Sequence, residues 1–391
     1  YNSVNYGPTS FITPASQPKT SSLAGQRDQS VFSARQSRLW FKVAGPTLLG
    51  AKTSSLIEFD FHDPNNTSTT SGNLNATPRL RHAYANLDWG TTQLLFGQTS
   101  DNFGILSGNT VDFNAGGPEG FFSGSRNPQI RLTQRVALGA GNSLKFVVAA
   151  QTPNQDNFTN SGATGAAGGT GDTWGSLPNA VGQILFTSKA LGVSPGQYGF
   201  SLKEFTAGFF GLYGAQNIQG QAKLLDSWGA GFYTFVPVLK SKDGKSRANT
   251  LTIEAQTYVA ANIPTATATS SVGKITTANP NGLNPAKGYG IASNIIYYPT
   301  QDWSFSVGYG QRGVLNNDDY VNNTNYEIRN ELFWFNTFYD LNAAVRVAAE
   351  YQYLRTSYGN VKNNTTAGSA LAGLADTGQA NIGRFALYYF F

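Results

Sequence analysis

The sequence predicts an all-β protein, a transmembrane antiparallel β-barrel of about 16 strands with one loop folded into its interior. Three observations predict this fold class. Alternation of apolar and polar residues, which is the period of a β-strand, recurs along the whole chain of 391 residues. The connections between the alternating segments are short and long in turn. The chain ends in the strand NIGRFALYYFF, whereas a soluble domain usually ends in frayed polar residues.

The composition agrees with a membrane β-protein and excludes several alternatives. Only 13% of the residues are charged, about half the share of an ordinary globular domain. No run of 18 apolar residues is present, which excludes a membrane-spanning helix. The chain has no cysteine, so disulfide bonds and thiolate metal sites are excluded as well.

Fifteen strands are predicted from the alternation and from the turn residues that bound it. No segment shows a helical period over ten or more residues. The predicted strands cover residues 34–45, 53–62, 79–89, 93–99, 128–138, 143–151, 179–188, 198–213, 223–236, 249–262, 286–298, 302–313, 325–337, 341–355 and 381–391.

The alternating lengths of the connections orient the barrel, because such barrels have short periplasmic turns and long extracellular loops. The final strand then runs toward the periplasm, and so does the strand at 34–45. Residues 1–33 would form an extracellular loop. Bacterial barrels have even strand numbers, so we expect a sixteenth strand, either upstream of residue 1 or poorly marked within residues 1–14. Residues 1–391 are expected to form a single barrel domain.

Each strand has a lipid face and a lumen face. In SRLWFKVAG, Leu39, Phe41 and Val43 would face lipid, which directs Arg38 and Lys42 into the lumen. The same rule assigns to the lipid face Ile57, Phe59 and Phe61; Ile130, Leu132, Val136 and Leu138; Ile328, Leu332 and Trp334; Val345, Val347, Ala349 and Tyr351; and the final stripe Phe385, Leu387, Tyr389 and Phe391. That stripe resembles the carboxy-terminal signature of outer-membrane barrel proteins.

Several stretches in the first third of the chain resemble the DcaP-like porins, a trimeric outer-membrane family. They are FSARQSRLWFKVAGPTLLGAKTSSLIEFDF (32–61), PRLRHAYANL (78–87), GQTSDNFG with TVDF (97–104 and 110–113) and NPQIRLTQ (127–134). The resemblance implies a 16-stranded homotrimer in the bacterial outer membrane, in contact with lipid and lipopolysaccharide, that passes small anionic solutes such as dicarboxylates. A barrel of this size encloses an aqueous channel.

Charged residues at predicted lumen positions are the candidate functional site. Residues 100–127 are expected to form the constriction loop, as the third extracellular loop does in general porins. Facing acids and bases would produce a transverse field that attracts anions. The alternative is that the arginines pair with Glu58, Asp60, Glu327, Glu331 and Glu350 and only stiffen the wall. The basic candidates are Arg38, Lys42, Arg79, Arg81, Arg131, Arg135 and Arg384, and the acidic candidates in the loop are Asp101, Asp112 and Glu119.

Two other functions are weighed against a porin. A barrel hydrolase would need a clustered catalytic set, but His62 and His82 are separated by a long loop, and His82 has lipid-face parity. An adhesion or assembly protein would act through its surface loops, with the lumen incidental. We therefore predict that the protein is not an enzyme, with no catalytic residues, no metal, no cofactor and no nucleic-acid partner.

Overall fold

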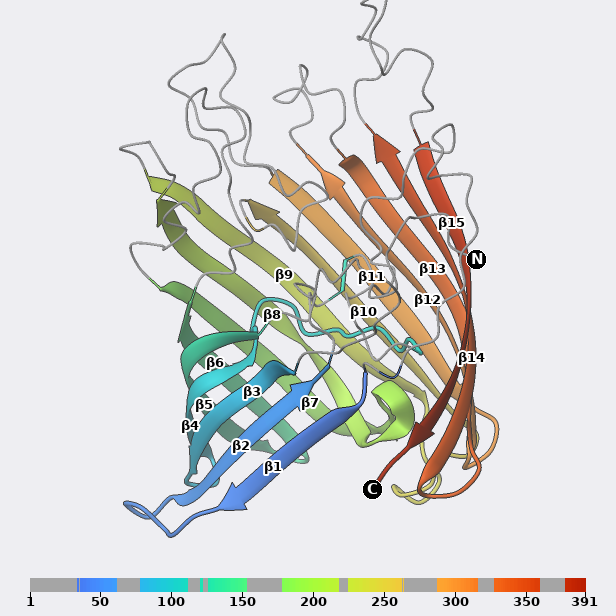
Figure 1. Ribbon diagram of the computed structural model, residues 1–391. Helices are drawn as coiled ribbons and strands as arrows, with labels where there is room; N and C mark the ends of the chain where they lie inside the picture. Colours follow the sequence, from blue (N-terminus) through green and yellow to red (C-terminus); the bar gives the residue numbers. More distant parts are fainter. Residues whose placement is uncertain are drawn as a thin grey trace, which may run out of the picture.

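The computed structural model describes residues 34, 36–61, 78–111, 120–121, 126–152, 178–217, 224–261, 263, 287–315, 327–358 and 377–391. In this part of the chain fifteen strands form one antiparallel sheet, and each strand pairs with its neighbours in sequence. Figure 1 shows the sheet curving into a barrel wall. The predicted all-β fold class and the fifteen predicted strands are confirmed. No described helix is both long and apolar enough to cross a membrane.

Some strands are longer than predicted and others are shorter. Their bounds are β1 (Arg38–Ala44), β2 (Lys52–Asp60), β3 (Arg79–Asp88), β4 (Thr92–Ser100), β5 (Arg126–Gly139), β6 (Asn142–Gln151), β7 (Asn179–Pro195), β8 (Leu202–Asn217), β9 (Leu224–Leu239), β10 (Thr250–Ala261), β11 (Lys287–Tyr298), β12 (Trp303–Val314), β13 (Glu327–Asp340), β14 (Val345–Tyr358) and β15 (Thr377–Tyr389).

The described sheet begins with β1 and ends with β15, and the described residues show no pairing between these two strands. The predicted extracellular loop at residues 1–33 and the part of it proposed to hold a sixteenth strand, residues 1–14, lie outside the described residues. The sixteenth strand therefore stays a prediction.

Seven short connections lie at one end of the sheet, here called the short-turn end, because consecutive antiparallel strands must turn back at alternate ends. The tightest joins β5 to β6 in the sequence GAGN. Gly139, Ala140 and Gly141 all have positive φ there, at 85°, 50° and 76°. Two of the three are glycines, for which this conformation carries little steric cost. The local sequence thus explains the turn.

The outer face of the sheet is apolar and exposed, as expected of a surface that meets lipid. Phe41 is 63% exposed and Ile130 61%. At the end of the chain Phe385 is 88% exposed and Phe391 82%, with Leu387 and Tyr389 between them on the same face. The outward directions predicted for Ile130 and for the last strand are confirmed.

The prediction for β13 is wrong. Leu332 and Trp334 were expected to face lipid, but they are 1% and 0% exposed and point to the inside. Phe333 and Phe335 are exposed on the outer face instead. Both faces of this strand are apolar, so hydrophobicity alone could not separate them.

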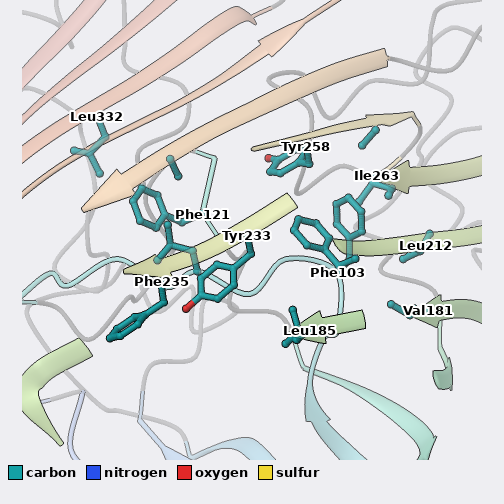
Figure 2. Packing of buried hydrophobic residues seen from close by; sticks show 14 of the residues in the cluster. Phe103, Phe121, Val181, Leu185, Leu212, Tyr233, Phe235, Tyr258, Ile263 and Leu332 are labelled. Carbon is teal, nitrogen blue, oxygen red and sulfur yellow. The ribbon is translucent and has the colours of Figure 1, made fainter. Parts of the chain in front are cut away.

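A segment inside the barrel explains the apolar inner face of β13. Residues 101–111 leave β4 and cross the interior (Figure 1), and together with residues 120–121 they are called the inner segment below. Phe103 packs edge-on against Phe210 at a ring distance of 5.2 Å, and Phe121 packs edge-on against Trp334 at 5.2 Å. Figure 2 shows the resulting cluster, which is completed by Leu106, Val181, Leu185, Leu212, Tyr233, Phe235, Tyr258, Ala260, Ile263, Ala292, Leu332, Leu354 and Ile382.

Candidate functional site

The inner segment is hydrogen-bonded to the wall along its length. On β10, Gln256 Oε1 accepts the backbone N–H groups of Ile105 and Leu106 at 2.7 and 3.0 Å. Gln256 Nε2 donates to the backbone oxygen of Gly120 at 3.1 Å, so one amide holds two parts of the segment. These bonds satisfy backbone groups that would otherwise be buried without partners.

Asn109 makes the next set of contacts, one strand after another. Its backbone N–H donates to Asn294 Oδ1 on β11 at 3.1 Å, and its Nδ2 donates to Ser306 Oγ on β12 at 3.1 Å. Its backbone oxygen accepts Asn336 Nδ2 from β13 at 2.5 Å. The segment therefore follows the wall from β10 toward β14.

A connection from the short-turn end also contacts the inner segment. Between β7 and β8 lies a 3-10 turn, η2 (Gln197–Gly199). Gln197 Nε2 donates to the backbone oxygen of Gly108 at 2.6 Å, and the Tyr198 hydroxyl donates to that of Thr110 at 2.9 Å. The sequence predicted that β8 begins at residue 198, and this inward turn was missed.

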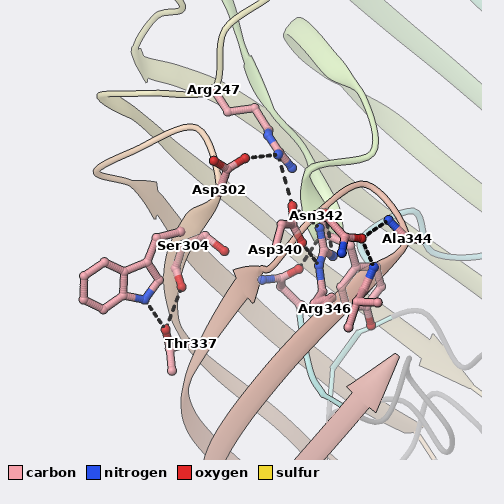
Figure 3. Close-up of polar contacts among 12 residues, drawn as sticks. Arg247, Asp302, Ser304, Thr337, Asp340, Asn342, Ala344 and Arg346 are labelled. Carbon is pink, nitrogen blue, oxygen red and sulfur yellow. Dashed lines mark hydrogen bonds and ion pairs between the residues drawn. The ribbon is translucent and has the colours of Figure 1, made fainter. Parts of the chain in front are cut away.

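Charged residues at the short-turn end bind one another (Figure 3), and Arg346 also binds η2. Arg346 Nη1 donates to the backbone oxygen of Tyr198 at 3.0 Å, while its Nε and Nη2 donate to the two carboxylate oxygens of Asp340 at 2.5 and 3.0 Å. Arg247 also donates to Asp340, at 3.0 Å. Bidentate arginine–carboxylate pairs of this kind fix geometry as well as charge.

The inner segment leaves only part of the inner wall in contact with solvent. On β10 and β11 every inward side chain is buried. On the inner face of β1–β6, by contrast, Lys42 and Arg135 are exposed, and Arg38 and Arg131 are half-buried. Water therefore reaches this part of the inner wall at Lys42 of β1 and Arg135 of β5, and most of the predicted basic residues lie on these six strands.

Two of those basic residues are neutralised by acids on the neighbouring strand. Arg79 Nη2 lies 2.6 Å from Asp60 Oδ2. Arg81 Nε lies 2.5 Å from Glu58 Oε1, and its Nη1 lies 2.8 Å from Asp60 Oδ2. The four side chains carry no net charge as a group. For Arg79 and Arg81 the geometry is that of the structural-pairing alternative.

Arg131 and Arg135 on β5 are different, because no described carboxylate lies within 4 Å of either. Arg131 Nη1 donates to the neutral Oδ1 of Asn102 in the inner segment at 3.2 Å. Arg135 is directly opposite Lys145 of β6 in the strand register. Like charges at such positions are destabilising. A wall built only for stability would not need this repulsion.

Lys145 was missed in the sequence, although the alternation in SLKFVVAA places it on the same face as Val147 and Ala149, which are buried. It lies close enough to Arg131, Arg135 and Lys203 for their charges to repel it. Arg126, at the start of β5, was also missed; Arg81, Arg79 and Arg38 repel it, and Asp60 attracts it. The basic surface is thus larger than the sequence analysis proposed.

The remaining basic candidates lie in different surroundings. Arg38 of β1 is opposite Asp60 in the register and interacts electrostatically with Glu58, Asp60 and Arg81. Lys42 is exposed on the same strand. Arg384 Nη1 lies on β15, 3.1 Å from the buried Glu350 Oε1, and is not part of the exposed surface along β1–β6.

Among the acidic candidates only Asp101 lies within the described residues; Asp112 and Glu119 lie outside them. Asp101 is buried, and its Oδ1 accepts the backbone N–H of Phe103 at 2.9 Å and Gln151 Nε2 at 2.7 Å. It therefore caps the turn into the inner segment next to β6. It does not face the basic residues from the opposite side.

His82 lies on the inner face, contrary to its predicted lipid parity. In the pairing of β2 with β3, Glu58 is opposite His82 and Phe59 is opposite Leu80, which leaves Arg81 as a bulged residue. The extra residue reverses the alternation, so Arg81 and His82 both point inward. His82 Nδ1 lies 3.0 Å from Thr99 Oγ1. His62 lies outside the described residues, and in the described part no three His, Asp or Glu side chains are grouped as a metal site.

The comparisons with known proteins agree with this architecture. The sequence matches no family model and no curated protein. The structure is similar to that of the outer membrane channel DcaP of Acinetobacter baumannii, with a TM-score of 0.64 and 19% identity, over 92% of this chain and 86% of that chain. It is also similar to an anion-selective porin from Comamonas acidovorans, with a TM-score of 0.54 and 9% identity, over 92% of this chain and 91% of that chain. The likeness to DcaP that the sequence suggested is confirmed for the fold, and this chain has the β-barrel architecture of an outer membrane channel.

Proposed function

We propose that the protein is a porin of the bacterial outer membrane that lets small hydrophilic anions, carboxylates above all, diffuse passively through its lumen. The observation that carries this proposal is a group of cations on the inner face of β5 and β6 with no described carboxylate within 4 Å, namely Arg131, Arg135 and Lys145. Asp88 of β3 acts on Arg135 from a longer distance. Such charges raise the local concentration of anions in a narrow channel. A guanidinium also offers a fork of N–H donors that fits a carboxylate.

Arg79, Arg81 and Arg384 have a second role in this proposal. Their acidic partners cancel much of their charge, so they hold the wall and contribute less to selectivity. The two similar structures are an outer membrane channel and an anion-selective porin, which supports the proposal. We extend it, on the resemblance noted in the sequence, to a homotrimer in contact with lipid and lipopolysaccharide that acts without enzymatic activity and passes dicarboxylates among its solutes.

The test is the reversal potential of single channels in planar bilayers with asymmetric KCl. We expect the sign that corresponds to anion preference, strong at low salt and weak near 1 M, because the Debye length falls from about 10 Å at 0.1 M to about 3 Å at 1 M. Cation preference in the unmodified protein would overturn the proposal. Absence of current would favour the alternative in which the barrel acts through its surface loops.

A further inference from the structure

The inner segment ends against a buried carboxylate. Glu350 lies on the inner face of β14 and is 5% exposed. Its Oε2 accepts the backbone N–H of Val111 at 2.8 Å and Asn336 Nδ2 at 2.9 Å. Its Oε1 accepts Gln352 Nε2 at 2.8 Å and Arg384 Nη1 at 3.1 Å. One side chain thus joins the segment to three strands of the wall.

All four of these contacts bring a donor to Glu350, and an ionised carboxylate is the side-chain group that can only accept. A glutamine of the same shape would turn an NH₂ group toward two of the donors. Hydrogen bonds to an ionised acceptor are roughly twice as strong as neutral ones. The attachments at Gln256, Asn294 and Ser306 are neutral, so Glu350 supplies the charged anchor at the Val111 end of residues 101–111.

The neighbouring strand holds the same point of the segment. The Tyr388 hydroxyl on β15 donates to the backbone oxygen of Val111. Both backbone polar groups of Val111 are therefore bound by side chains of the wall, one from β14 and one from β15. Val111 is 3% exposed, so water does not compete at this site.

We propose that Glu350 is a positioning residue that fixes the far end of the inner segment to the wall and so sets the width of the passage. The inference deepens the proposed porin function, but its structural part does not depend on it. If Glu350 cannot accept the Val111 N–H, residues 105–111 should detach from β14 while the sheet itself stays intact. The passage beside β1–β6 should then fluctuate in width.

The experiment is amide hydrogen exchange of Glu350→Gln in detergent, read by mass spectrometry for peptides of the inner segment and of β14. We expect exchange over residues 105–111 to be faster by about tenfold or more, because a hydrogen bond to a charged group is lost. Exchange over residues 345–349 of β14 should be unchanged. The matched control is Gln352→Met, which removes a donor to Glu350 but leaves the bond to Val111, and it should leave residues 105–111 protected.

Faster exchange throughout β14, or equal effects of the variant and the control, would overturn the proposal and leave Glu350 a general stabiliser. If Glu350→Gln does not fold, Tyr388→Phe gives a second test, because it removes the other bond to Val111 without changing charge. It should increase exchange over the same residues by a smaller factor, and unchanged exchange would contradict the proposal.

Single-channel current should be noisier in Glu350→Gln. A chain that passes no current would refute the porin function, while the exchange result would still decide the role of Glu350.

Discussion

Neutralising Arg131 should lower the anion preference of the channel without unfolding the barrel. The change Arg131→Gln keeps a polar side chain of nearly the same reach. In the structure it removes a half-buried cation whose hydrogen-bond partner is the neutral Asn102. No described carboxylate is left without its partner, so the wall should keep its stability.

The size of the effect follows from Coulomb's law. For an ion that passes about 6 Å from the guanidinium in water, the interaction is about 0.7 kcal/mol, and screening at 0.1 M reduces it to about 0.4 kcal/mol. The charge attracts an anion and repels a cation by this amount. The ratio of anion to cation permeability therefore changes by about three- to fourfold. At 1 M the same charge changes the ratio by only about 1.4-fold.

The assay is the reversal potential of Arg131→Gln in asymmetric KCl at both ionic strengths. Lys242→Gln is the matched control, because it removes one positive charge from an exposed position in the turn between β9 and β10. We expect a clear shift toward cations for Arg131→Gln at low salt and almost none for the control. Equal shifts would mean that overall charge sets selectivity. No shift in either variant would refute the role given to β5.

Three further predictions concern stability and assembly. Arg81→Gln should destabilise the barrel by about 3 kcal/mol, since it leaves Glu58 and Asp60 to share Arg79. The midpoint of urea unfolding measures this loss of stability, and an unchanged midpoint would contradict the pairing of Arg81 with these acids. Lys145→Gln should lower anion preference yet raise stability by up to about 1 kcal/mol, because it relieves the repulsion from Arg135; a loss of stability would argue for a structural role. Gly120→Ala should weaken the barrel, because Gly120 has a φ of +75° and a Cβ there would overlap the backbone oxygens of Ile291 and Gln311. Gly383→Ala is the control; a Cβ at Gly383 would meet open space, so this change should not weaken the barrel.

The sequence predicted the fold well wherever a strand meets two different environments. In β5 one face carries Ile130, Leu132 and Val136 and the other carries Arg131, Thr133 and Arg135, and the predicted faces are correct. In β13 the inner face is covered by the inner segment, so Leu332 and Trp334 are as apolar as the outward Phe333. Period-2 patterning then carries no information about direction. Only the packing of the distant Phe121 resolves it.

The candidate site was predictable in composition but not in pairing. Alternation directed Arg79 and Arg131 toward the lumen alike. Their difference depends on the register of β2 against β3, which places Asp60 opposite Arg79. The direction of His82 was also not predictable from alternation, because the single unpaired residue at the Arg81 bulge reversed the parity of His82. Neither register nor bulge has a signal in the local sequence.

The distribution of acids around the inner wall is itself an argument for function. β2 supplies Glu58 and Asp60 beside Arg79 and Arg81, so the chain does place compensating acids where cations serve the wall. On β5 and β6 the inward positions between the cations hold Thr133, Val147 and Ala149 instead, and no acid is placed there. An aspartate at residue 133 would offset the repulsion between Arg135 and Lys145 at little steric cost. A feature that reduces stability and lacks the obvious compensation is expected at functional sites. Asp88 of β3 interacts electrostatically with Arg135, but no described carboxylate lies within 4 Å of the cations on β5 and β6. We therefore propose that these cations mark the part of the lumen where a mobile anion, rather than a side chain, supplies most of the negative charge.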